Sequence, residues 1–265
     1  MERLLVLRLE CLGCSAEALL NGVPLAWVGG PRTVATLPVH EYAIAGQNEL
    51  TLVVNPAAPG LSTPPPEPRL SDGQAWASLR LLLPRMGSVA HPASARTVAQ
   101  LDWAPTPDEV YFAPAQLRQS VALPIAFPRW RWLDAPLITE TPTLKNEVAA
   151  YLLEIALGLA RGNPEPLILA SRLRFEELAA AYQRPMTDDV DRLRQQLQTL
   201  HALQPLKPAF PVVSALLLRP VAGGRLLDCL TVDGQPALQS PVAGGGRLSW
   251  PLRVAAVEGR FYVLR

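Results

Sequence analysis

Side chains that could act as an acid or a base are few in this sequence and widely spaced. Its three histidines are His40, His91 and His201. None of them falls in an H-E-x-x-H motif or near a cysteine or carboxylate at ligand spacing. His201 closes an expected helix, where an imidazolium interacts favourably with the helix dipole. These positions favour structural roles for all three histidines over general-base catalysis.

Asp228 is the strongest candidate for a catalytic carboxylate because it interrupts the apolar run 226–230. If the C-terminal strands form a cone, Asp228 could point inward beside Tyr151 or Trp250 and act as a base with a raised pKa. Alternatively, strand alternation sends Asp228 to the other face, as an edge residue at the rim of the sheet. We favour the second interpretation.

The cysteines form an odd set, Cys11, Cys14 and Cys229, of which the first two make a C-x-x-C motif. A redox motif of this form precedes a helix, whose dipole lowers the thiol pKa, but here β-like sequence follows. A zinc site needs two further ligands at matching spacing, and the sequence has none. We predict structural thiols, with metal or redox chemistry as the alternative, and expect no metal and no cofactor.

The chain also lacks the glycine motifs of nucleotide-binding and hydrolytic enzymes. Gly244–Gly246 precedes a strand-like run, so no helix N-terminus follows that could bind a phosphate. There is no G-x-S-x-G elbow, no G-x-G-x-x-G after a strand and no Gly-Lys-Ser/Thr. This pattern favours a protein without catalytic activity.

Arginine and tryptophan alternate at the end of the N-terminal half, in the segment 127–132. This alternation could make a stacking or cation–π platform for a ligand or a nucleic acid. We favour a strand that turns Trp130 and Trp132 toward the next domain and Arg129 and Arg131 outward. A net charge of +1 gives no support for nucleic-acid binding.

Composition indicates a folded protein, since 49% of its 265 residues are hydrophobic. No apolar run is long enough to span a bilayer, and the N-terminus alternates like a strand and does not resemble a signal peptide. We therefore expect a cytoplasmic protein. Lys145 and Lys207 are the only lysines among abundant arginine, alanine and proline, a composition typical of GC-rich bacterial genomes.

The only sustained helical pattern spans Thr141 to Leu203, and three helices are expected within it. Thr141 and Pro142 provide an N-cap and a first-turn proline for the first helix, and Gly162 provides its stop. The second runs from Glu165 to Tyr182, with Leu169 among its buried residues. Thr187 or Asp188 caps the third. The apolar face of the first helix consists of Leu144, Val148, Tyr151, Leu152, Ile155 and Leu159.

Short strands separated by turns are expected on both sides of the helices, which gives an α+β fold with two domains, residues 1–136 and 137–265. In the first, Asn21-Gly22 predicts a hairpin turn, and Leu50, Leu52 and Val54 share one face of a strand. Short strands are also expected at 33–37 and 39–44. The proline-rich segment 55–73 is read as a surface loop. In the second, five strands are expected after the helices, at 212–218, 225–232, 235–239, 246–252 and 260–264.

Turn chemistry in the first domain resembles that of galactose-binding-like jelly-roll modules. The resemblance covers about 40 residues and rests on the Asn-Gly turn at Asn21 and on the G-x-N-x-L sequence of Gly46–Leu50. It implies an all-β sandwich. It would also accommodate carbohydrate or small-ligand binding if aromatic side chains cluster over a groove.

The second domain resembles the NTF2-like cone fold over about 120 residues. The segment 153–165 is an amphipathic helix ending in an Arg-Gly-Asn-Pro-Glu turn, and helices and antiparallel strands follow it. The resemblance implies a curved sheet around the helices. Isomerases, dehydratases and non-catalytic binding proteins share this fold, so an isomerase or hydrolase using Asp228 in a cone pocket remains one alternative.

Because no catalytic set converges, we expect a non-enzymatic bacterial protein-interaction module, an adaptor or an immunity-like protein. The partner would be another protein, with no nucleic acid and no membrane involved. It would bind exposed apolar surface, either at the proline-rich loop or at the candidate surface residues Trp130, Arg131, Trp132, Tyr151 and Trp250.

Overall fold

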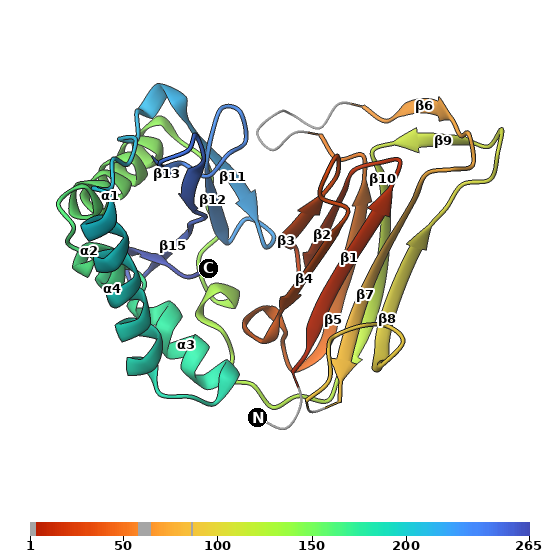
Figure 1. Cartoon of the computed structure of the whole chain (residues 1–265), viewed down its shortest axis with the longest axis horizontal. Coiled ribbons are helices and arrows are strands. Elements are labelled where there is room, and N and C mark those ends of the chain that lie inside the picture. The colour runs from red at the N-terminus through yellow and green to blue at the C-terminus, as the bar shows by residue number, and fades with distance from the viewer. Residues whose placement is uncertain (1–3, 58–64, 86) are drawn as a thin grey trace. The chain divides into compact units, whose positions relative to one another are not determined.

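The computed structural model describes residues 4–57, 65–85 and 87–265 (Figure 1). The fold is α+β, and its described residues contain four α-helices and several antiparallel sheets. Two compact units are present: an N-terminal unit of residues 4–57 and 65–129, and a C-terminal unit of residues 130–265. The sequence placed the division at Pro136, whereas the C-terminal unit begins at Trp130.

Antiparallel strands build the N-terminal unit. Two four-stranded sheets have the orders β4-β1-β7-β8 and β10-β5-β2-β3, and β6 pairs with β9. The strands are β1 Val6–Leu12, β2 Ala16–Leu20, β3 Val23–Val28, β4 Val34–Pro38, β5 Gly46–Val54, β6 Glu67–Leu70, β7 Trp76–Pro84, β8 Ala95–Trp103, β9 Val110–Ala113 and β10 Ala115–Leu123.

Strand alternation gives each four-stranded sheet one apolar face. In β5, Leu50, Leu52 and Val54 are all fully buried, as their spacing predicts. The predicted turn at Asn21-Gly22 joins β2 to β3, and both residues have positive φ, 53° and 73°. These angles are those of a type I′ turn, whose twist matches the flanking strands.

Two local predictions for this unit are wrong. Residues 40–42 form a 3-10 turn instead of a strand, and the Nε2 of His40 accepts a hydrogen bond from the Leu5 N–H at 2.7 Å. Part of the predicted loop 55–73 is strand β6, whose single proline, Pro68, is tolerated because the strand lies at an edge. The rest of that loop includes residues 58–64, which lie outside the described residues.

The helices of the C-terminal unit group on one side of its strands (Figure 1). Thr141 caps the first as predicted, and its side chain accepts a hydrogen bond from the Leu144 N–H at 3.1 Å. The predicted second helix is in fact two, because the chain bends at Ser171. The last begins at Met186 without a side-chain cap, so the predicted caps Thr187 and Asp188 are wrong. The bounds are α1 Pro142–Ala160, α2 Glu165–Ala170, α3 Arg172–Tyr182 and α4 Met186–Leu203.

The described strands of this unit number six, one more than predicted. They form a four-stranded sheet, β11-β12-β15-β16, and a separate pair, β13-β14. Leu152 and Ile155 of α1 pack on Leu227 and Cys229 of β12 in the main core. The bounds are β11 Leu216–Val221, β12 Leu226–Thr231, β13 Leu238–Pro241, β14 Arg247–Trp250, β15 Arg253–Val257 and β16 Arg260–Val263.

Two physical reasons favour glycine at position 162, just after the end of α1. Its φ is +70°, and a Cβ built there would lie 2.7 Å from the ring of His201. Gly223 also has a positive φ, +65°, but a Cβ there would meet nothing within 4 Å. It therefore serves as a matched control that carries the backbone strain without the steric clash.

We expect Gly162→Ala to destabilise the C-terminal unit by about 2–5 kcal/mol, the sum of left-handed strain and overpacking. Gly223→Ala should cost only about 1–2 kcal/mol. Urea unfolding followed by circular dichroism measures both values. If both variants lose the same free energy of unfolding, the His201 ring moves aside for the added methyl group and does not restrict position 162.

Candidate functional site

An open pocket of about 710 Å³ lies within the C-terminal unit. Its walls come from α1, from α2, from the first residue of α3 and from the strand β16. The volume lies in the range of cavities that hold a small molecule or a few side chains of a bound protein. Among the predicted surface residues, Tyr151 lines this pocket.

Aromatic and aliphatic side chains make up much of the pocket wall. The rings of Tyr151 and Phe261 lie 5.8 Å apart, at an angle of 50°. Leu169 of α2 also lines the pocket and is 69% exposed. Its predicted burial is therefore wrong. Three successive apolar residues, 167–169, could have indicated this, because one helix face cannot bury all three.

Charged side chains surround this apolar wall, and some are already paired. Glu165 accepts from Arg194 at 2.7 Å, and Arg172 lies 3.9 Å from Glu176. Arg260 and Glu154 also line the pocket, and neither has an ion-pair partner in the part of the chain that the structure describes. The pocket therefore presents one unpaired cation and one unpaired anion beside apolar groups.

The hydroxyl of Tyr151 is unsuited to act as a general base. Its oxygen is buried and has no hydrogen-bond partner among the described residues. Burial raises the pKa of the hydroxyl well above its ordinary value, while the nearby backbone of Val263 acts in the opposite direction. The hydroxyl therefore stays protonated at physiological pH, and the ring contributes shape and apolar surface to the pocket.

Asp228 does not join this pocket. It lies in β12, a central strand, so its predicted place at the edge of the sheet is wrong. Leu227 and Cys229 face the core with α1, and alternation therefore turns Asp228 to the opposite face of the sheet from Tyr151. Its carboxylate is buried and lies 3.6 Å from the guanidinium of Arg253. We therefore assign Asp228 a structural role.

The tryptophans also lie apart from the pocket. Trp130 and Trp132 are 0% and 2% exposed, and neither lines the pocket. The predicted strand at this position is wrong, because Arg131–Leu133 is a 3-10 turn. Trp250 ends β14, is half-buried and packs against the main core.

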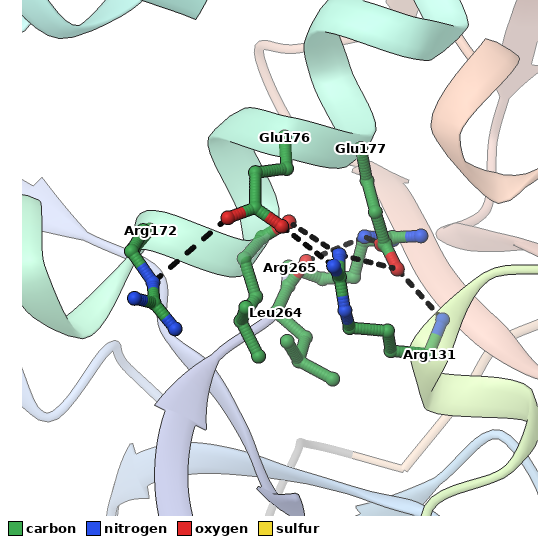
Figure 2. Close-up of polar contacts among 7 residues, drawn as sticks. Arg131, Arg172, Glu176, Glu177, Leu264 and Arg265 are labelled. Atoms are coloured by element: carbon green, nitrogen blue, oxygen red, sulfur yellow. Dashed lines mark hydrogen bonds and ion pairs between the residues drawn. The ribbon is translucent and has the colours of Figure 1, made fainter.

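Arg131 belongs to a polar cluster around α3 that extends to Arg172 at the pocket (Figure 2). Its backbone N–H donates to Glu177 at 2.6 Å, and its guanidinium donates to Glu176. Arg265 donates to Glu177 from the other side. The segment that follows the N-terminal unit is thereby held against α3.

The cysteines have the features of structural thiols. Cys11 donates to the carbonyl oxygen of Cys14 at 3.2 Å, and all three cysteines are free. Burial raises the pKa of Cys14 to about 12, which is opposite to what a redox thiol requires. Within residues 4–57, 65–85 and 87–265, no group of three or more His, Cys, Asp or Glu side chains could hold a metal ion.

A second exposed apolar surface lies in the N-terminal unit, on the strand pair β6–β9. Pro68 lies opposite Phe112, and Leu70 lies opposite Val110, so alternation places all four side chains on one face. Leu70, Val110 and Phe112 are 67%, 60% and 58% exposed. Pro68 and Leu70 belong to the proline-rich segment 55–73, which was predicted as a possible partner surface but as a loop, without its pairing to β9.

Comparisons with known proteins identify no relative of this chain. No family model matches the chain, and neither curated proteins nor solved structures show significant similarity to it. No helix in the described part of the chain is both long and apolar enough to cross a membrane.

Proposed function

We propose that this chain is a non-enzymatic protein-interaction module and that its C-terminal pocket receives apolar side chains of a partner protein. The observation that supports this most directly is the 69% exposure of Leu169 within a pocket that also contains Tyr151 and Phe261. Side chains in apolar pockets of this kind contribute most of the binding energy at protein interfaces.

The groups at the pocket support binding more than catalysis. The carboxylate of Glu165 is neutralised by Arg194, and hydrogen bonding to that arginine lowers its pKa. The Tyr151 hydroxyl keeps its proton, and Asp228 faces away from the pocket. General acid–base catalysis needs a titratable group within reach of the substrate and with a pKa near the working pH.

We further propose that the N-terminal unit is a jelly-roll-like β-sandwich and that the C-terminal sheet is a cone of the NTF2-like kind. The apolar face of each N-terminal four-stranded sheet supports the first proposal, because two such faces can bury one another. The packing of α1 on β12 supports the second.

We expect Leu169→Asp to weaken partner binding at least about 100-fold, because it places a carboxylate in the apolar pocket. A photo-crosslinking residue at position 169, introduced in cells that produce the protein, identifies the partner. Isothermal titration calorimetry with the purified partner then measures the affinity. The unfolding curve of the variant should remain close to that of the parent protein, because Leu169 is already exposed.

Leu203→Asp is the matched control, since Leu203 is 81% exposed on α4 and does not line the pocket. Its affinity should equal that of the parent protein. Leu70→Asp probes the exposed face of β6–β9. Loss of binding in Leu70→Asp with full binding in Leu169→Asp would move the docking site to the N-terminal unit and refute the proposal.

A further inference from the structure

One wall of the pocket is the free edge of a sheet. β16 pairs with β15 on one side and is the last strand in the order β11-β12-β15-β16. The backbone N–H and C=O groups on the other side of such a strand can pair with an incoming segment. Arg260, Phe261 and Tyr262 of this strand line the pocket.

The turn before β16 determines which backbone groups face outward. Glu258 and Gly259 have φ values of 51° and 75°, as in a type I′ turn, and Val257 and Arg260 close it. In such a hairpin the closing pair exchanges hydrogen bonds, and the pairs then alternate. The backbone of Phe261 is therefore directed away from β15.

The C-terminal end of β16 independently indicates which backbone groups face away from β15. The Leu264 N–H donates to the carbonyl oxygen of Arg253 in the neighbouring segment, at 2.9 Å. Alternation from Leu264 again turns Tyr262 toward β15 and turns Phe261 and Val263 outward. Among the residues that the structure describes, no hydrogen bond from a loop or a side chain is found for the N–H or C=O of Phe261.

The pocket lies against the outward groups of Phe261, and Arg260 precedes that residue. Arg260 is exposed and has no ion-pair partner within the described ranges, so a carboxylate can reach it without breaking an existing ion pair. Arg172, at the same pocket, has a single ion-pair contact within the described part of the chain, a long one of 3.9 Å with Glu176. Arg260 and Arg172 therefore favour an acidic residue in the part of the incoming segment that lies beside β16, while Glu154 belongs to the α1 wall of the pocket.

We propose that the partner contributes an extended segment that adds to β16 at Phe261. Its apolar side chains pack beside Leu169, and an acidic side chain pairs with Arg260. This inference rests on the proposed function and specifies its partner chemistry. Four residues of strand span about 13 Å, so a segment of about four to six residues covers the edge.

Synthetic eight-residue peptides test this mode directly. The set alternates leucine with threonine and carries one aspartate at each position in turn. Titration into the full chain selects the tightest peptide, and amide hydrogen exchange by NMR then follows the Phe261 N–H. We expect exchange at Phe261 to slow at least about tenfold when this peptide is bound, because its N–H becomes hydrogen-bonded.

Charge reversal tests the second contact. Arg260→Glu should weaken the aspartate peptide about tenfold, and a peptide with lysine in place of that aspartate should recover the loss. Arg32→Glu is the control: Arg32 is exposed, lies in the N-terminal unit and has no ion-pair partner among the described residues. Arg32→Glu should bind the aspartate peptide as the parent protein does.

The outcomes separate this inference from the proposed function. Peptide binding that depends on Leu169 but leaves Phe261 unprotected overturns strand addition and leaves the pocket as a docking site. If no peptide binds while the partner still crosslinks at position 169, strand addition is also overturned. If no peptide binds and no partner crosslinks at position 169, the proposed function itself is overturned. If protection of the Phe261 N–H from exchange increases with protein concentration in the absence of peptide, a second copy of this chain binds the edge. That outcome overturns strand addition by a partner protein.

Discussion

Replacing Glu177 by alanine is expected to lower the free energy of unfolding of the C-terminal unit by about 3–5 kcal/mol. The Glu177 side chain is 5% exposed and accepts hydrogen bonds from the Arg131 backbone and from the guanidinium of Arg265 (Figure 2). The Arg265 side chain is 0% exposed. Without Glu177 the buried guanidinium of Arg265 loses a carboxylate that accepts from it, and breaking a buried ion pair by removing one member is strongly destabilising.

Urea unfolding followed at 222 nm measures this effect, because the described α-helices all lie in the C-terminal unit. Glu176→Ala is the matched control. The adjacent Glu176 side chain is 38% exposed and pairs with Arg131 and Arg172, so its loss should cost less than about 1 kcal/mol. Equal losses at the two positions would mean that solvent reaches Arg265 and that the pair is not buried in solution.

Replacing both members of the pair separates charge from packing. Glu177→Met combined with Arg265→Met should recover most of the stability lost in Glu177→Ala, because both charges of the buried pair are removed together and apolar side chains of similar size replace them. A double variant as unstable as Glu177→Ala would show instead that shape and the hydrogen bond to the Arg131 N–H dominate.

Local signals in the sequence predicted the elements that depend on local chemistry. Thr141 and Pro142 located the start of α1, and Asn21-Gly22 located the β2–β3 turn. The bend at Ser171 has no such signal, since neither glycine nor proline lies there. Its position depends on how α2 and α3 pack, and intrinsic propensity does not encode tertiary packing.

The candidate site could be predicted only in part, for the same reason. Periodicity placed Tyr151 on the apolar face of α1, and that face does reach the pocket. The apolar run 167–169 indicates that one of its residues is exposed, but periodicity could not show that this residue is Leu169 or that it lines a pocket, because the direction of a short helix depends on its neighbours. Asp228 shows the converse: alternation correctly separates it from Cys229, but only the sheet order makes its strand a central one.

Trp130→Ala should destabilise the C-terminal unit by about 3–5 kcal/mol, the usual cost of deleting a buried tryptophan. Trp130 is fully buried, and the Arg265 guanidinium carbon lies 5.7 Å from its ring centroid, within the range of a cation–π interaction. Trp130→Phe keeps an aromatic face and should therefore lose less. Urea unfolding at 222 nm compares the three proteins under one condition.

Trp130 and Glu177 both act on Arg265, which makes their effects dependent on each other. The Trp130→Ala, Glu177→Ala double variant should lose less stability than the two single losses added together, by about 0.5–3 kcal/mol. Strict additivity would show that the ring and the carboxylate do not share Arg265. Binding at Leu169 should be unchanged in the folded fraction of Trp130→Ala, because a buried tryptophan stabilises the unit without contacting the partner. A selective loss of binding in Trp130→Ala would show that Trp130 contributes to the partner surface after all.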